Sequence, residues 1–187
     1  MAVRIYGNRE IKTLPGDATR PTSSKVREAL FNIWQGRVRG ARWLDLCAGS
    51  GAMGAEALCR GAAQVVGIEH SAAACRIVSE NWQKVAKPEQ AYKVIRADVL
   101  KGITTVSGSF DLVYFDPPYA GGLYLPLLNQ LTQYLVTGGE AAVEYGSSHW
   151  NPEQLPKTVT DQLTLVREKH YGNTHLAFFR HQSDASY

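Results

Sequence analysis

The tetrapeptide Asp116-Pro117-Pro118-Tyr119 directly follows the apolar run Phe110 to Phe115. A continuous run of aliphatic and aromatic residues is typical of a strand that is covered on both faces. The tetrapeptide therefore comes where a buried strand ends. Open α/β sheets bind their ligands at the carboxyl ends of their strands, so this is a candidate functional site.

These residue types suit one chemistry, the methylation of an exocyclic amine on a nucleobase. Such an amine is a poor nucleophile because its lone pair is delocalised into the ring, and acceptors for its N–H groups help to localise that lone pair. Asp116 offers a carboxylate, while Pro117 and Pro118 lack an N–H and leave a carbonyl free to accept. Tyr119 offers a ring for stacking, worth about 1–3 kcal/mol per base. The plainer alternative is that the prolines only end the strand.

A glycine-rich loop follows another predicted strand, Trp43 to Leu46. Gly49, Gly51 and Gly54 match the pattern G-x-G-x-x-G, and Glu69 follows about 20 residues later, where a dinucleotide fold places its ribose-binding acid. This pattern alone is compatible with an NAD or FAD enzyme. It is also compatible with a tight turn that has no ligand.

Carboxylates at the strand ends argue against a dinucleotide. Asp45, Glu69, Asp98 and Asp116 each lie at or next to the end of a predicted strand, so they should line one edge of the sheet. A pyrophosphate would meet negative charge there, whereas the sulfonium and amino groups of S-adenosylmethionine would be attracted. We therefore predict S-adenosylmethionine as the cofactor.

Each acid has an expected role with this cofactor. Glu69 would accept hydrogen bonds from both ribose hydroxyls, and Asp98 would accept one from the adenine amino group. Asp45 would orient the loop or the methionine amino group. Any one of the three could instead be an ordinary surface acid.

Strand patterns alternate with helical patterns from residue 42 onward, which predicts parallel strands with right-handed crossovers in a doubly wound α/β sheet. The predicted strands are 43–46, 64–69, 92–97, 110–115 and 140–145, and an antiparallel hairpin, 162–170 with 174–180, closes the chain. This makes seven strands in all. A helix is predicted after Thr22-Ser23-Ser24, with an apolar face formed by Val26, Ala29, Leu30, Ile33 and Trp34.

The N-terminal segment, residues 1–28, is basic. Its cations are Arg4, Arg9, Lys12, Arg20, Lys25 and Arg27, against Glu10, Asp17 and Glu28. We expect a small flap or hairpin over residues 1–21 and one main domain over 22–187. The cations could contact a polyanion or simply be solvated.

Composition limits the classes that remain. The chain has 187 residues, 44% of them hydrophobic, which fits one globular domain with a full core. Its three cysteines form no CxxC pair, and neither a signal peptide nor an apolar stretch of about 20 residues is present. We expect a cytoplasmic protein without a metal site.

The motifs together resemble those of the RsmD family, the bacterial small-subunit ribosomal RNA guanine-N2 methyltransferases, within the class I S-adenosylmethionine-dependent enzymes. The resemblance rests on the N-terminal segment from Arg4 to Trp34, the glycine loop, Asn81, DPPY and YGNTHLAFF together, and its specific part is RPTSSKVREALF in front of the glycine loop. DPPY alone is shared with DNA adenine and protein glutamine methyltransferases. Cys47 and Ala55 stand where larger apolar residues are expected.

The resemblance implies a Rossmann-like methyltransferase fold that acts on guanine N2 in 16S ribosomal RNA, as a monomer and within an assembling small subunit. It places Thr22, Arg27 and Glu28 beside the cofactor or target pocket. The full expected cofactor set is Thr22, Arg27, Asp45, Ala48, Gly49, Ser50, Gly51, Glu69, His70, Asp98 and Val99. The expected substrate contacts are Arg4, Arg9, Lys12, Arg20 and Tyr119. DNA adenine-N6 methylation, or a non-catalytic binding module with this fold, stays open as an alternative.

Overall fold

A computed structural model describes residues 2–14, 23–117, 122–146 and 157–183. The chain divides into two compact units, Met1–Val106 and Ser107–Tyr187. The expected boundary between a flap and a main domain, at residues 21 and 22, lies outside the described residues.

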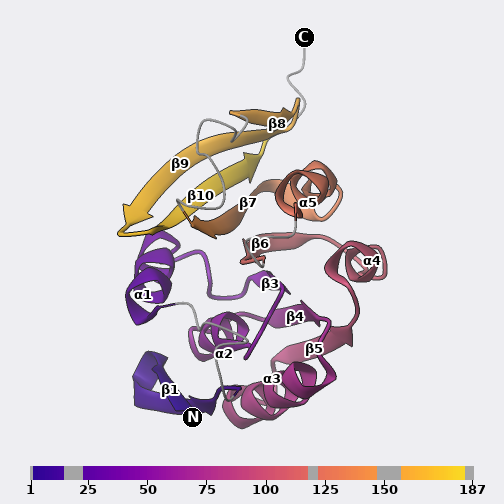
Figure 1. The fold of residues 1–187 in the computed structure, drawn as a ribbon. Helices are drawn as coiled ribbons and strands as arrows, with labels where there is room; N and C mark the ends of the chain where they lie inside the picture. Colours follow the sequence, from indigo (N-terminus) through magenta and orange to yellow (C-terminus); the bar gives the residue numbers. More distant parts are fainter. Residues whose placement is uncertain (1, 15–22, 118–121, 147–156, 184–187) are drawn as a thin grey trace. The chain divides into compact units, whose positions relative to one another are not determined.

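The first unit begins with an antiparallel hairpin and continues as alternating strands and helices (Figure 1). In the hairpin, β1 (Ala2–Ile5) pairs with β2 (Arg9–Lys12) across the short helical turn η1 (Tyr6–Asn8). The helices are α1 (Ser24–Ile33), α2 (Ala52–Cys59), α3 (Ala72–Val85) and α4 (Val99–Ile103). The parallel strands β3 (Arg42–Leu46), β4 (Gln64–Glu69) and β5 (Ala91–Arg96) lie in the order β5-β4-β3.

Helix α1 forms where the sequence predicts it. The Ser23 hydroxyl accepts from the Val26 N–H at 3.2 Å, which caps the first turn. Its buried face differs from the prediction, because Arg27 and Phe31 are buried while Ala29 and Ile33 are only half-buried. Phe31 stacks on Trp43 with ring centroids 5.3 Å apart, which draws this side of the helix onto β3.

The second unit starts with the parallel pair β6 (Phe110–Phe115) and β7 (Leu135–Gly146), joined through α5 (Tyr124–Leu131). The antiparallel strands β8 (Thr158–Thr160), β9 (Leu163–Tyr171) and β10 (Thr174–His181) complete the order β6-β7-β10-β9-β8. The long arrows of β9 and β10 lie side by side in Figure 1.

These elements confirm an α/β fold with mostly parallel strands and a C-terminal antiparallel hairpin. Strands β4 and β6 have the predicted bounds, whereas β7 begins five residues before the predicted start. The short β8 adds a strand that the sequence did not predict. Within the described ranges, no helix is long and apolar enough to cross a membrane.

Candidate functional site

The glycine loop leaves the carboxyl end of β3 and leads into α2. Gly51 has a φ of 72°, which a residue with a side chain rarely adopts. A Cβ there would lie 2.8 Å from the Trp82 ring nitrogen, and one at Gly54 would lie 2.4 Å from a Trp82 ring carbon. The sequence suggested that these glycines admit a ligand. In the structure, Trp82 of α3 already explains why positions 51 and 54 are glycine.

Acidic and amide side chains hold the loop backbone. Asp45 Oδ2 accepts from the Gly54 N–H at 3.0 Å, and Glu69 Oε2 accepts from the Gly49 N–H at 2.9 Å. The Asn81 amide donates to the Ser50 carbonyl at 2.9 Å. The Ala48 N–H donates to the Ile68 carbonyl of β4 at 3.0 Å. Two backbone N–H groups of the G-x-G-x-x-G pattern, those of Gly49 and Gly54, therefore already donate to acidic side chains.

Asp45 is buried, with 1% of its surface exposed. Burial raises the pKa of its carboxyl to about 8, while the bond from Gly54 lowers it and the Glu69 charge raises it. Burial therefore favours the neutral form of the Asp45 carboxyl. The bond from the Gly54 N–H is compatible with a role of Asp45 in orienting the loop, and this role stays a prediction.

Glu69 ends β4 and is also buried. Its Oε1 accepts from the Ser71 N–H at 2.8 Å and lies 3.1 Å from Nδ1 of the exposed His70. Each carboxylate oxygen has two lone pairs, so Glu69 keeps acceptor capacity beyond its bonds to Gly49 and Ser71. Its role toward ribose stays a prediction.

Asp98 is exposed and caps α4. Its Oδ1 accepts from the N–H groups of Leu100 at 3.1 Å and Lys101 at 3.4 Å, and the neighbouring Val99 is buried. The sequence did not foresee this capping. The proposed bond from Asp98 to adenine is not excluded by it, because both cap bonds use the same oxygen.

The proposed catalytic tetrapeptide belongs to the second unit. Asp116 and Pro117 directly follow β6, where Asp116 is half-buried and Pro117 is buried. Pro118 and Tyr119 lie outside the described residues. The strand ends where the sequence predicted, and the roles of all four residues stay predictions.

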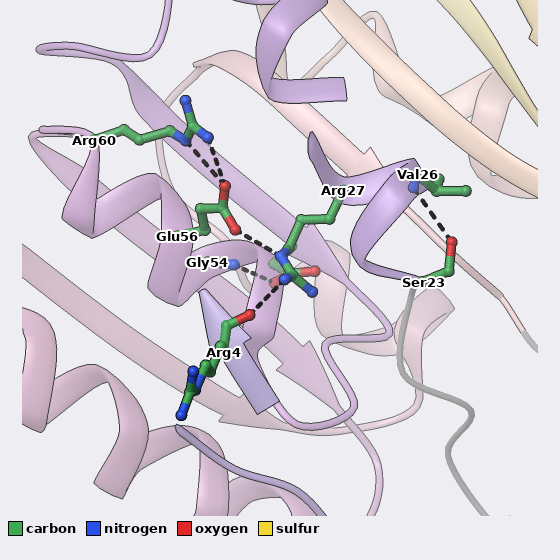
Figure 2. Close-up of polar contacts among 8 residues, drawn as sticks. Arg4, Ser23, Val26, Arg27, Gly54, Glu56 and Arg60 are labelled. Carbon is green, nitrogen blue, oxygen red and sulfur yellow. Dashed lines mark hydrogen bonds and ion pairs between the residues drawn. The ribbon is translucent and has the colours of Figure 1, made fainter. Parts of the chain in front are cut away.

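Arg27 forms a buried ion pair with Glu56 (Figure 2). Its Nε donates to Glu56 Oε2 of α2 at 2.6 Å, and its Nη2 donates to the Arg4 carbonyl of β1 at 2.6 Å. Both side chains of the pair are 2% exposed. The structure therefore gives Arg27 a definite role in joining α1 to α2 and to the hairpin, and its expected place beside the cofactor stays a prediction. Thr22 lies outside the described residues.

The expected substrate contacts of the hairpin are exposed. Arg4 Nε lies 3.4 Å from Glu10 Oε1, Lys12 Nζ lies 2.6 Å from Glu80 Oε2, and Arg9 Nη1 lies 3.0 Å from Cys59 Sγ. Exposed pairs of this kind contribute little to stability, so their cations can exchange partners. Arg20 lies outside the described residues.

Comparison with known proteins identifies the family. The protein-family model described as "Conserved hypothetical protein 95" matches residues 3–180 of this chain. The chain is 32% identical to ribosomal RNA small subunit methyltransferase D of Escherichia coli over 187 residues, covering 98% of this chain and 91% of that protein. It is 31% identical to YlbH of Bacillus subtilis over 174 residues, 92% of this chain and 93% of that protein. The chain belongs to the RsmD family.

Solved structures agree with this membership. The RsmD-family chain matches the Escherichia coli protein yhhF with a TM-score of 0.82 and 28% identity, over 98% of this chain and 100% of that one. It shares its fold with the Thermus thermophilus 16S rRNA N2 G1207 methyltransferase, solved with AdoMet and guanosine, at a TM-score of 0.74 and 21% identity. That match covers 98% of this chain and 50% of that protein.

Two residues of α3, Asn81 and Trp82, bond to the glycine loop, and the sequence motifs did not predict these contacts. Asn81 was noted only as part of the resemblance, and Trp82 was not noted. Asn81 exchanges two hydrogen bonds with the backbone of Lys12, at 2.8 and 2.9 Å, while it holds Ser50. The Trp82 ring N–H donates to the Gly51 carbonyl at 2.8 Å. Spacing along α3 carries no signal for these contacts, because their partners are about 30 and 70 residues away.

Proposed function

We propose that this protein transfers a methyl group from S-adenosylmethionine to the exocyclic N2 amine of a guanine in small-subunit ribosomal RNA. The observation that carries the proposal is its membership of the RsmD family over residues 3–180, with relatives named ribosomal RNA small subunit methyltransferase D. Ribosomal RNA methylation follows from those names. The guanine, its N2 position and an assembling subunit as substrate are our finer proposal, as are the monomeric state and the cytoplasmic location.

The cofactor is S-adenosylmethionine, and the glycine loop supports it over a dinucleotide. Phosphate-binding loops present free backbone N–H groups to the phosphate oxygens. Here the N–H groups of Gly49 and Gly54 already donate to Glu69 and Asp45. A pyrophosphate would have to displace these two carboxyl groups, whereas a ligand without phosphate can use their remaining lone pairs.

We propose that the cofactor is held by the acids and the loop backbone. Glu69 would accept from the ribose hydroxyls, and Asp98 would accept from the adenine amino group. Ala48, Gly49, Ser50 and Gly51 would present the loop backbone, with His70 and Val99 beside the two acids. Bound S-adenosylmethionine supplies a methyl group on a positively charged sulfur.

Asp116 and a proline carbonyl would act on the target amine. By accepting hydrogen bonds from its two N–H groups, they would localise the nitrogen lone pair before transfer. The ring of Tyr119 would stack on the base and fix its plane. Arg4, Arg9, Lys12 and Arg20 would contact phosphates, which position the RNA without reading its sequence.

The test uses nucleic acid and protein from a strain that lacks the gene. Labelled S-adenosylmethionine is added, and RNA, DNA and protein are then separated and the modified nucleosides identified by mass spectrometry. We expect label in small-subunit ribosomal RNA, as N2-methylguanosine. Label in DNA as N6-methyladenine, with none in ribosomal RNA, would select the DNA methyltransferase alternative. An absence of label in all three fractions would select the non-catalytic binding module.

A further inference from the structure

The first unit contains a cavity of about 730 Å³ away from the glycine loop. Its lining includes residues just before each parallel strand, namely Arg39 and Gly40 before β3, Gly61 to Ala63 before β4, and Lys87, Glu89 and Gln90 before β5. These positions are the amino ends of the strands. The glycine loop, Glu69 and Asp98 follow the carboxyl ends, so the cavity lies at the opposite edge of the same three strands.

Three of the four charged residues that line the cavity are cations, namely Arg39, Arg60 and Lys87. Arg39 and Lys87 are exposed, and Glu89 is the acid among the lining residues. Arg60 is already engaged, because its guanidinium bonds to Glu56 at 2.8 and 3.0 Å. Arg39 and Lys87 are therefore the cations placed to meet an anionic ligand.

Tyr6 gives the cavity an exposed aromatic ring. It lies in the turn of the hairpin and is 51% exposed, more than any other large hydrophobic residue in the described ranges. The Arg60 guanidinium lies 4.4 Å from the centre of the Tyr6 ring and 4.8 Å from that of Phe31. A ring that is supported by a fixed cation and still half exposed is suited to stack on a nucleobase.

The hairpin connects this cavity with the cofactor loop. At the start of β2, Arg9 contacts Cys59, which lines the cavity. At the end of β2, the Lys12 backbone bonds to Asn81, which also holds Ser50 of the glycine loop. The exposed cations Arg4, Arg9 and Lys12 therefore lie along a path between the two sheet edges. The strands β3, β4 and β5, which have five or six residues, span about 15–20 Å at about 3.3 Å per residue, a gap that a few nucleotides can bridge.

We propose that the cavity is a second RNA-binding site, which takes a single-stranded segment next to the methylated nucleotide. Tyr6 stacks on one base of this segment, and Arg39 and Lys87 contact its phosphates. The inference rests on the proposed function in one respect, that the substrate is RNA. Within the first unit, it adds a site at the sheet edge opposite to the glycine loop.

The test measures binding of a fluorescently labelled, single-stranded oligoribonucleotide of mixed sequence to the full chain over a range of salt concentrations. Tyr6→Ala should weaken binding about 5- to 100-fold, the range of one lost stacking contact. Arg39→Ala combined with Lys87→Ala should lower the salt slope, log K against log salt, by about 1.4, or about 0.7 per phosphate contact. Binding of S-adenosylmethionine should stay unchanged in each variant.

Matched controls come from the same unit. Tyr92 is 39% exposed and Lys93 is exposed, and neither lines the cavity, so Tyr92→Ala and Lys93→Ala should bind the oligonucleotide like the unmodified chain. The proposal is overturned if the cavity variants bind no more weakly than these controls. It is also overturned if guanosine monophosphate competes as strongly as an unlabelled oligonucleotide, because the cavity would then be a mononucleotide site.

Methyl transfer separates this inference from the proposed function. The cavity variants should raise KM for ribosomal RNA and leave kcat unchanged, because none of the substituted residues is among those proposed to act on the target amine or to hold the cofactor. Transfer to ribosomal RNA with an unchanged KM would overturn the second site alone. Oligonucleotide binding that depends on Tyr6, without any transfer to ribosomal RNA, would overturn the proposed function and leave the second site standing.

Discussion

Two ion pairs of equal length allow a sharp test of what burial does in this protein. Arg27 Nε lies 2.6 Å from Glu56 Oε2, and Lys12 Nζ lies 2.6 Å from Glu80 Oε2. Each side chain of the first pair is 2% exposed, whereas the side chains of Lys12 and Glu80 are 69% and 54% exposed. We therefore compare Glu56→Ala with Glu80→Ala.

Glu56→Ala should lower the free energy of unfolding much more than Glu80→Ala does. Among the described residues, it leaves the Arg27 guanidinium buried with a single bond, from Nη2 to the Arg4 carbonyl, because Nη1 has no partner there. Removing one partner of a buried pair costs about 3–5 kcal/mol, and removing an exposed pair costs about 0–1 kcal/mol. For a chain of this size, the larger loss lowers the melting temperature by about 6–20 °C.

The assay is urea unfolding followed by tryptophan fluorescence, since Trp34, Trp43 and Trp82 are all buried in the unit that holds the pair. The double variant Arg27→Met with Glu56→Leu removes both charges and should regain most of the lost stability. The reasoning is refuted if Glu56→Ala costs no more than Glu80→Ala, or if the double variant is as unstable as Glu56→Ala.

Four further predictions concern the proposed site. Glu69→Ala should weaken S-adenosylmethionine binding by about 1.5–3 kcal/mol in calorimetry, the worth of a charge-assisted hydrogen bond, and tighter binding of NAD would contradict the cofactor. Asp116→Ala should abolish methyl transfer in a radiometric assay while cofactor affinity falls only modestly, and equal losses of both would place Asp116 on the cofactor. Because the pKa of Asp45 is about 8 when folded and about 3.8 when unfolded, its contribution to stability should be full below about pH 4 and decline as the pH rises to about 8. Asp45→Asn should remove this decline in urea unfolding at pH 5 and pH 8, and an unchanged decline would contradict the shifted pKa. Neutralising Arg4, Arg9 and Lys12 together should weaken RNA binding and reduce its salt dependence with cofactor binding unchanged, and an unaltered salt slope would contradict phosphate contacts.

The elements that the sequence predicted well are those whose signal is local. The apolar run of β6 and the serine cap of α1 are each contained in a few neighbouring residues, and both lie where they were predicted. The structure of the candidate site differs from the prediction where the surroundings of a residue depend on a partner that is distant in the sequence. Arg27 looked like an exposed cation, and it is buried because Glu56, 29 residues later, pairs with it. Gly54 was noted only as part of the G-x-G-x-x-G pattern, and the ring of Trp82, 28 residues later, accounts for the glycine at this position.

In the N-terminal hairpin, the backbone groups that anchor it are different from the side chains that carry its exposed positive charge. Its backbone is held by other residues: Asn81 bonds twice to Lys12, Arg27 donates to the Arg4 carbonyl, and Lys84 donates to the Glu10 carbonyl at 2.7 Å. These bonds do not use the hairpin's own cationic side chains, which stay exposed. Substituting those side chains should therefore leave the hairpin in place, so that a loss of RNA binding reports on the charges themselves. The same backbone bonds join the hairpin to Ser50 through Asn81, so the surface that we expect to receive RNA and the loop that we expect to hold the cofactor share one support.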